Sequence, residues 1–223
     1  MNKIKATYEI LTSVSEGGIR ELQHIEKIGR VCYKSEDYIT EDGESAKKFV
    51  AMLIRNGPEA MIEHSFLSVK FTVDRGVSHE LVRHRIASFA QESTRYCNYA
   101  KDKFGAECAF IDLEPGIMLD NKMKKMSAEE IALVLAEWKS AMEDAERHYM
   151  KLLELGATPQ IARAVLPNST KTEITVSANY REWRNFFKLR VPADVHPQMR
   201  EVTIPLLKEL KGMIPVIFDD IEV

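Results

Sequence analysis

The chain has 223 residues, 45% of them hydrophobic and 29% charged, which describes a globular protein long enough for one sizeable domain and short for two. Its formal net charge of −3 argues against general nucleic-acid binding, and its three widely spaced cysteines suggest neither a disulfide framework nor a zinc ribbon. The sequence shows neither a signal-peptide pattern nor an apolar run of membrane-spanning length, so we expect a cytoplasmic protein without membrane contacts.

The first third of the chain predicts a strand, two helices and a second strand. Residues 6–14 alternate well enough for a strand, and Gly17-Gly18 then opens a helix that ends within residues 30–33. A second helix at about 44–56 stops at Asn56-Gly57-Pro58. The clearest strand follows, in which four apolar side chains alternate with polar ones: Leu67, Val69, Phe71 and Val73.

A charged segment comes directly after this strand. We expect a helix at about 77–87 with Arg83, His84 and Arg85 near its C-terminal end. Residues 88–96 should then form an irregular loop that offers hydroxyl and amide groups. A strand followed at once by a charged helix is a common way to hold a site on rigid elements.

The second half of the chain predicts more helix than strand. Ser127 and Glu130 form a capping box that starts the longest helix, which runs to about Leu155 and is closed by Gly156. The other expected elements are strands at 108–113 and 170–178, a short helix between Thr158 and Pro167, and helices at about 180–189 and 197–211. Together the elements predict one α+β domain over residues 1–223, richer in helix than in sheet.

Arginine gathers in one short region of this acidic chain. Residues 75–95 contain four arginines and two glutamates, a local surplus of two positive charges. Arginine presents a rigid fork of donors suited to phosphate or carboxylate, and a cluster of them is costly to bury without an anion. The region could be a basic patch facing water, but Ile86, Phe89 and Tyr96 favour an inward-facing segment. We therefore predict a site for a small anionic ligand.

Other chemistry in this region is less well supported. His79 and His84 nearly form a His-Glu-x-x-His zinc motif, but five helical residues turn by about 500° and leave the two side chains on different faces. Ser93 lacks the Gly-x-Ser-x-Gly context of a nucleophile, so a hydrogen bond to a ligand phosphate is the better interpretation. Cys97 is better explained as a small apolar residue beside Tyr96 than as a nucleophile.

The arginine region also carries a family resemblance. Arg83-His84-Arg85, followed by seven residues and Ser93, resembles the signature of the flavin-dependent thymidylate synthases. Similar family segments occur in the same order elsewhere and cover most of the chain from about Arg30 to Gln198: residues 30–33 (RVCY), 63–65 (EHS), 161–167 (IARAVLP), 179–181 (NYR) with Asn185, and 189–190 (LR) with 196–198 (HPQ). The resemblance implies the family's helix-rich fold around a central, largely antiparallel sheet.

The resemblance implies a role for each matching residue. The positions that would bind FAD are His64, Arg83, His84, Arg85, Gln91, Asn179, Arg181, Asn185 and His196. The positions that would bind deoxyuridine monophosphate (dUMP), chiefly through its phosphate, are Glu80, Arg83, Gln91, Ser93, Thr94, Arg95, Arg163 and Arg190. Arg190 is the implied catalytic residue: its positive charge lies against the uracil and favours ionisation at N3, an electrostatic role.

The reaction and the partners also follow from the resemblance. The similar enzymes methylate dUMP to dTMP with 5,10-methylenetetrahydrofolate as carbon donor and a hydride from FAD that NADPH has reduced, without a protein nucleophile or a metal. They are homotetramers in which each site combines residues from several subunits. Because the chain has no Gly-x-Gly-x-x-Gly fingerprint, FAD cannot be held in the Rossmann manner.

A few positions depart from the family pattern. Gln91 stands where some members have glutamate, Ala90 replaces a polar residue, and Cys32 replaces a serine. Val191-Pro192 forms a small insertion before His196, which makes the match of His196 less secure than that of Arg190. None of these changes alters the spacing from Arg83 to Ser93.

Two other functions remain to be weighed against the synthase. One is a module that recognises nucleotides or RNA through the arginine region, where Phe89, Tyr96 and Tyr99 interleave with the charges. The other is a nucleotide hydrolase, which would need clustered carboxylates for a metal ion, and the region contains none. The acidic total charge and the ordered family matches favour the synthase.

Overall fold

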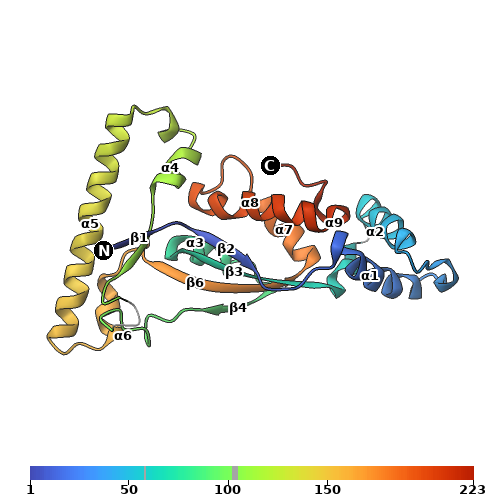
Figure 1. The fold of residues 1–223 in the computed structure, drawn as a ribbon, viewed down its shortest axis with the longest axis horizontal. Helices are drawn as coiled ribbons and strands as arrows, with labels where there is room; N and C mark the ends of the chain where they lie inside the picture. The colour runs from blue at the N-terminus through green and yellow to red at the C-terminus, as the bar shows by residue number, and fades with distance from the viewer. Residues whose placement is uncertain (58, 102–104) are drawn as a thin grey trace.

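The computed structural model describes residues 1–57, 59–101 and 105–223, and a four-stranded sheet lies at its centre (Figure 1). Every neighbouring pair of strands in this sheet is antiparallel. The spatial order is β2 (Thr7–Ile10), β3 (Phe66–Asp74), β6 (Lys171–Asn179) and β4 (Ala87–Gln91). Two short parallel strands, β1 (Asn2–Ile4) and β5 (Ala109–Ile111), form a second sheet.

Helices form most of the remaining regular structure. The longer ones are α1 (Ile19–Val31), α2 (Glu44–Asn56), α3 (Arg75–Leu81), α5 (Ala128–Glu154), α7 (Tyr180–Arg190) and α8 (Pro197–Met213). Shorter ones are α4 (Glu114–Leu119), α6 (Pro159–Ala162) and α9 (Pro215–Phe218), with 3-10 turns at Glu16–Gly18, Glu36–Tyr38, Glu59–His64, Met123–Lys125 and Arg163–Val165. The predicted α+β class, helix-rich around an antiparallel sheet, is therefore confirmed.

One face of the sheet carries the main hydrophobic core. The four apolar residues whose alternation predicted β3 are all fully buried there: Leu67, Val69, Phe71 and Val73. Helices α3, α7 and α8 pack on this face, and Figure 1 shows α7 and α8 on one side of the sheet, with α1 and α2 at its end. The opposite face of β3 is more open: Phe66 is exposed, and Ser68 and Lys70 are half-buried.

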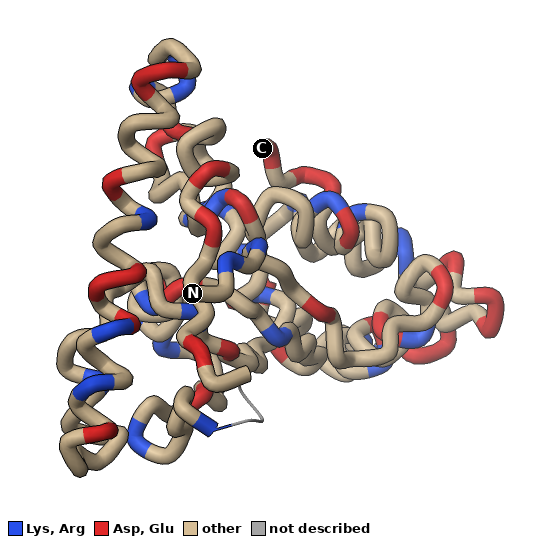
Figure 2. Tube along the Cα trace, turned by 60° about the vertical axis from the view of Figure 1, so that its left-hand side comes forward, with Lys and Arg blue, Asp and Glu red and all other residues tan. Residues whose placement is uncertain are grey.

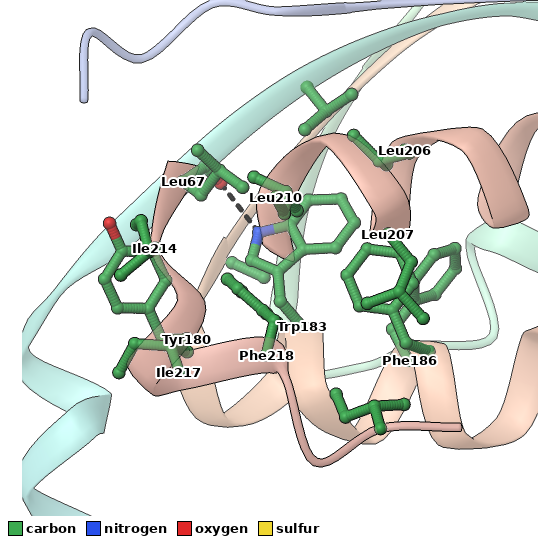
Figure 3. Packing of buried hydrophobic residues seen from close by; sticks show 14 of the residues in the cluster. Leu67, Tyr180, Trp183, Phe186, Leu206, Leu207, Leu210, Ile214, Ile217 and Phe218 are labelled. Carbon is green, nitrogen blue, oxygen red and sulfur yellow. Dashed lines mark hydrogen bonds between the residues drawn. The ribbon is translucent and has the colours of Figure 1, made fainter. Parts of the chain in front are cut away.

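Trp183 fixes α7 against β3. Its indole ring is buried among Phe186, Phe187 and Phe71, and Figure 3 shows it surrounded by side chains from α8 and α9. Its Nε1 donates a 3.0 Å hydrogen bond to the backbone carbonyl of Leu67. A buried indole N–H needs such an acceptor, so this bond sets where α7, and with it Arg190, lies relative to the sheet.

Helix α5 lies at the other end of the molecule from α1 and α2 (Figure 1). The predicted capping box is present: Glu130 N donates to Ser127 Oγ, and Ser127 N donates to Glu130 Oε2. A second, smaller core joins α5 and α6 to β5 through Tyr149, Cys108 and Phe110. Acidic and basic residues intermingle along α5 (Figure 2), as expected of a helix that faces solvent.

Most predicted elements match the structure, and two predictions are wrong. The bounds of α2 agree with the expected 44–56, although Pro58 of its stop signal lies outside the described residues. The helix expected at 77–87 is α3, which ends at Leu81, so Arg83-His84-Arg85 lie in the turn after it. The loop expected at 88–96 begins with β4, which pairs with β6. Strand β1 and helices α4 and α9 had no clear sequence signal.

Candidate active site

The turn after α3 contains Arg83, His84 and Arg85, and their side chains differ in exposure. Asp74 caps α3 by accepting a 2.7 Å hydrogen bond from the backbone N–H of Val77. After the helix, the backbone N–H of His84 donates to the carbonyl of Leu81, which closes a tight turn. His84 is therefore buried, whereas Arg83 and Arg85 on either side of it are exposed.

Both ring nitrogens of His84 make hydrogen bonds. Nδ1 lies 3.0 Å from Oε1 of Glu182, and Nε2 accepts a 3.0 Å bond from Nε of Arg190. The ring also meets the edge of Phe186 at a centroid distance of 4.9 Å. Burial lowers the pKa of His84 below its ordinary value, the hydrogen bond to Glu182 opposes that shift, and the charge of Arg190 adds to it. A neutral imidazole is thus favoured at neutral pH.

Arg190 is held in place from the other side by Glu80. The NH1 of Arg190 lies 2.8 Å from Oε2 of Glu80, and NH2 donates to the Glu80 backbone carbonyl at 3.3 Å. The second carboxylate oxygen of Glu80 lies 2.8 Å from Nδ1 of His196. His196 in turn contacts the amide of Gln198, which donates to Asp74 at the start of α3. These contacts join α7, α3 and the start of α8, although the one between Glu80 and His196 is a close approach without hydrogen-bond geometry.

A second group of predicted residues lies beyond the far end of β4. Gln91 points inward, and its amide donates to the hydroxyls of Ser78 and Thr172 at 2.9 and 3.2 Å. Buried Thr94 accepts a 3.1 Å hydrogen bond from NH1 of Arg163. β4 runs from residue 87 to residue 91, about 13 Å at roughly 3.3 Å per residue. The strand therefore separates this group from the turn that holds His84.

The surroundings of Ser93 do not form a nucleophilic arrangement. Its hydroxyl accepts a 3.3 Å hydrogen bond from the backbone N–H of Arg95. Both nitrogens of His84 are bound by Glu182 and Arg190, so that imidazole is not free to take a proton from Ser93. The guanidinium of Arg95 lies over the Tyr96 ring at 5.3 Å from its centroid, exposed to solvent.

The remaining predicted flavin residues lie around the start of α7. A hollow of about 420 Å³ is lined by Asn179, Arg181 and Asn185, together with Ile86, Lys188 and three glutamates. Asn179 caps α7 by accepting a 2.8 Å hydrogen bond from the backbone N–H of Glu182. Arg181 pairs with Glu63. His64 lines a different hollow, of about 440 Å³, with Arg20, His24 and Tyr180, so one chain does not bring all of these residues together.

Comparisons with known proteins identify the family of this chain. Residues 19–216 match the family model described as thymidylate synthase complementing protein. The chain belongs to the flavin-dependent thymidylate synthase family. A family member from Corynebacterium aurimucosum is 33% identical over 215 residues, which cover 94% of this chain and 84% of the relative. One from Mycobacterium bovis is 29% identical over 204 residues, covering 89% and 79%.

Solved structures show the same fold. A UMP/dUMP methylase from Streptomyces cacaoi, crystallised with 5-Br dUMP, superposes with a TM-score of 0.78 at 25% identity. The superposition covers 98% of this chain and 96% of that one. This thymidylate synthase homologue is therefore a methyltransferase and has the fold of the nucleotide methylases.

The structure adds one residue to the site that the sequence prediction missed. Glu182 is buried and bonds His84, yet in the sequence it stands three residues after Asn179, where it resembles an ordinary helix-capping glutamate. Among the described residues no group of three His, Cys, Asp or Glu side chains could hold a metal ion. None of the described helices is both long and apolar enough to cross a membrane.

Proposed function

We propose that the protein methylates dUMP to dTMP, with 5,10-methylenetetrahydrofolate as carbon donor and FAD, reduced by NADPH, as hydride source. The observation that carries this proposal is the contact between Arg190 and His84, residues 106 positions apart in the sequence. It joins the Arg-His-Arg signature to the C-terminal arginine of the family pattern. No protein nucleophile is required, which agrees with the surroundings of Ser93.

The nucleotide would bind along β4. The phosphate would lie near Ser93, Thr94, Arg95 and Arg163, whose two hydroxyl and two guanidinium groups lie around the backbone turn after the strand. The uracil would lie near Arg190, whose guanidinium is already held by Glu80 and His84. There its charge favours ionisation at N3 of the uracil, because a fixed cation stabilises negative charge that develops close by.

The residues near α7 fit a flavin. The hollow with Asn179, Arg181 and Asn185 offers amide groups for the polar edge of a flavin ring, and Ile86, which is 69% exposed, offers an apolar surface for its face. Three glutamates also line this hollow, so the diphosphate would bind outside it, at the exposed Arg83 and Arg85. Bound FAD would supply the hydride that the methylation needs. The protein's own part is to bind and orient the two ligands and to supply fixed charge. Arg83, Arg85, Gln91, His64 and His196 would complete the flavin contacts.

We further propose that the protein works in the cytoplasm as a homotetramer with shared sites. Arg83 and Arg85 are exposed and make no ion pair with any residue that the structure describes. In addition, His64 lines a separate hollow from Asn179 and Arg181. These observations support sites that are completed by a neighbouring subunit.

Tritium release from C5-labelled dUMP tests the reaction directly. We expect release that depends on both the folate and NADPH, from a yellow protein that contains FAD. Labelled UMP should be assayed alongside, because the similar Streptomyces protein is a UMP/dUMP methylase. A colourless protein that does not take up added FAD, and releases no tritium, contradicts the proposal.

Arg190→Ala separates the catalytic role of this residue from flavin binding. Methylation should fall much more than FAD content, because in this proposal Arg190 lies beside the uracil and does not line the flavin hollow. Arg147→Ala is the matched control, since Arg147 is an exposed arginine on α5 that pairs with Asp144 at 2.9 Å. Equal losses of methylation and of FAD in Arg190→Ala are the result that excludes the assigned role.

A further inference from the structure

Glu182 is a buried carboxylate that contacts His84 and also lines the hollow that contains Asn179, Arg181 and Asn185. Its side chain is 9% exposed and that of His84 is 6% exposed. Oε1 of Glu182 lies 3.0 Å from Nδ1 of His84, and the amide of Asn185 makes longer contacts of 3.3 and 3.4 Å with the same carboxylate. The Glu182 backbone N–H is bound by Asn179. The carboxylate is thus fixed by α7 and directed at one ring nitrogen.

The hydrogen bonds around His84 determine its tautomer. Nε of Arg190 carries a hydrogen at any ordinary pH and can only donate. Nε2 of His84, 3.0 Å away, must therefore be the acceptor and carry no proton. In a neutral imidazole the proton is then on Nδ1, where the Glu182 carboxylate, which can only accept, lies at 3.0 Å. The two hydrogen bonds therefore run in the same direction: Arg190 donates to His84, and His84 donates to Glu182.

We propose that Glu182 is a positioning residue, which holds His84 in the Nδ1–H tautomer so that Nε2 remains an acceptor and orients Arg190. Without the carboxylate, His84 can adopt the Nε2–H tautomer. That tautomer places two donors against each other and leaves the guanidinium held by Glu80 alone. A carboxylate on the remote ring nitrogen fixes catalytic and metal-binding histidines in the same way. The effect on catalysis rests on the proposed function, whereas the tautomer itself does not.

The charges around His84 also predict a pH dependence. Glu182 and Arg190 face the ring directly from α7, and Phe186 covers it without charge; Glu80 and His196 reach it only through Arg190. Protonated His84 would place a second donor and a second positive charge against Arg190. Activity should therefore fall as the pH drops through the pKa of His84. Because Glu182 opposes the lowering of that pKa, its removal should move this acid limb to lower pH.

The first experiment is 15N NMR of histidine-labelled protein, with His84 assigned through His84→Gln. In the wild type we expect a neutral Nδ1–H imidazole at pH 7.5. In Glu182→Gln, whose amide can both donate and accept, we expect that single tautomer to be lost. An Nε2–H tautomer in the wild type overturns the proposal, whatever reaction the protein catalyses and whether or not the variant folds.

The second experiment measures turnover with dUMP at a range of pH values. Glu182→Gln should lose about 10- to 100-fold in kcat, as is typical for removal of an orienting partner, and kcat is measured on FAD-saturated protein because Glu182 also lines the hollow proposed for the flavin. Its acid limb should lie at lower pH than in the wild type. A merely structural role would lower the amount of active protein and leave the limb in place. Glu143→Gln, an exposed glutamate on α5, is the control. Unchanged kcat and acid limb in Glu182→Gln contradict the proposal; an inactive wild type contradicts the proposed function instead.

Discussion

The effect of pH on stability can be predicted in detail for one carboxylate, Glu201. It lies on α8, where Asp112 and Asp74 face it, and its Oε2 is buried without a hydrogen-bond partner in the described part of the chain. Burial raises the pKa of Glu201 to about 7 from an ordinary value of 4.5, and the two neighbouring carboxylates add to the shift. A hydrogen bond from the Ala6 backbone and the charge of Lys5 oppose the shift without cancelling it. Protonated Glu201 is therefore favoured in the folded protein.

The sign of the effect on stability follows from proton binding. Between about pH 4.5 and pH 7 the folded protein holds the Glu201 proton and the unfolded chain does not, so the free energy of unfolding falls as the pH rises. The difference of 2.5 pKa units would be worth about 3.4 kcal/mol at 1.36 kcal/mol per unit. Screening by solvent at a partly exposed group reduces this to roughly 1–2 kcal/mol.

Glu201→Gln removes this ionisation and keeps the shape of the side chain. We expect it to be more stable than the wild type at pH 8 by roughly 1–2 kcal/mol, which corresponds to roughly 2–8 °C in Tm for a chain of this size. At pH 4.5 the two proteins should differ much less. Urea unfolding at both pH values measures the difference, with the exposed Glu137→Gln on α5 as the control. A variant whose stability follows the wild-type pH dependence refutes the reasoning.

The remaining predictions concern one ion pair between a buried arginine and an exposed aspartate, and one departure from the family pattern. Asp220→Asn should lower stability at pH 7 by roughly 1–2 kcal/mol, because it weakens the 2.6 and 2.7 Å bonds to buried Arg184. The Arg184 hydrogen bond lowers the pKa of Asp220. The stability that the ion pair contributes is therefore present above about pH 4 and is lost as the pH falls through the lowered pKa. In thermal unfolding, the Tm values of the variant and the wild type should become equal at that low pH. Gln91→Glu should cost roughly 1–3 kcal/mol in urea unfolding, because the Ser78 hydroxyl must give up its hydrogen bond to the Arg75 carbonyl, and the Thr172 hydroxyl must turn as well, before they can donate to the new carboxylate. A loss above about 3 kcal/mol would show that these hydroxyls cannot turn.

The sequence predicts those elements whose apolar residues repeat with a clear period. Strand β3 and helix α2 are examples, because their periodic apolar residues are the ones that become buried. Strand β4 was not predicted because its inward residues, Ala87, Phe89 and Gln91, do not form an apolar row. The amide of Gln91 hydrogen-bonds to hydroxyl groups instead of making apolar contacts. Pairing with β6 outweighs this weak local pattern.

The candidate site was predicted as a set of residues and not as an arrangement. The family pattern names Arg190 and His84, but their contact depends on how α7 packs against β3 through Trp183. Nothing in the sequence around Glu80 indicates that it pairs with Arg190, 110 positions away. Long-range pairs of this kind follow from tertiary packing, which local periodicity does not encode.

The arginines of the site fall into two kinds with different physical tasks. Arg190 is only 19% exposed, and Glu80 and His84 hold it in one orientation, so little side-chain entropy would be lost on binding the uracil that we propose beside it. Arg83, Arg85 and Arg95 are exposed, and within the described residues no acidic side chain pairs with them. They leave an uncompensated positive potential that attracts phosphates from a distance. Neutralising an exposed arginine should therefore weaken ligand capture in a salt-dependent way, whereas loosening Arg190 through Glu182 should slow the chemical step at any salt concentration.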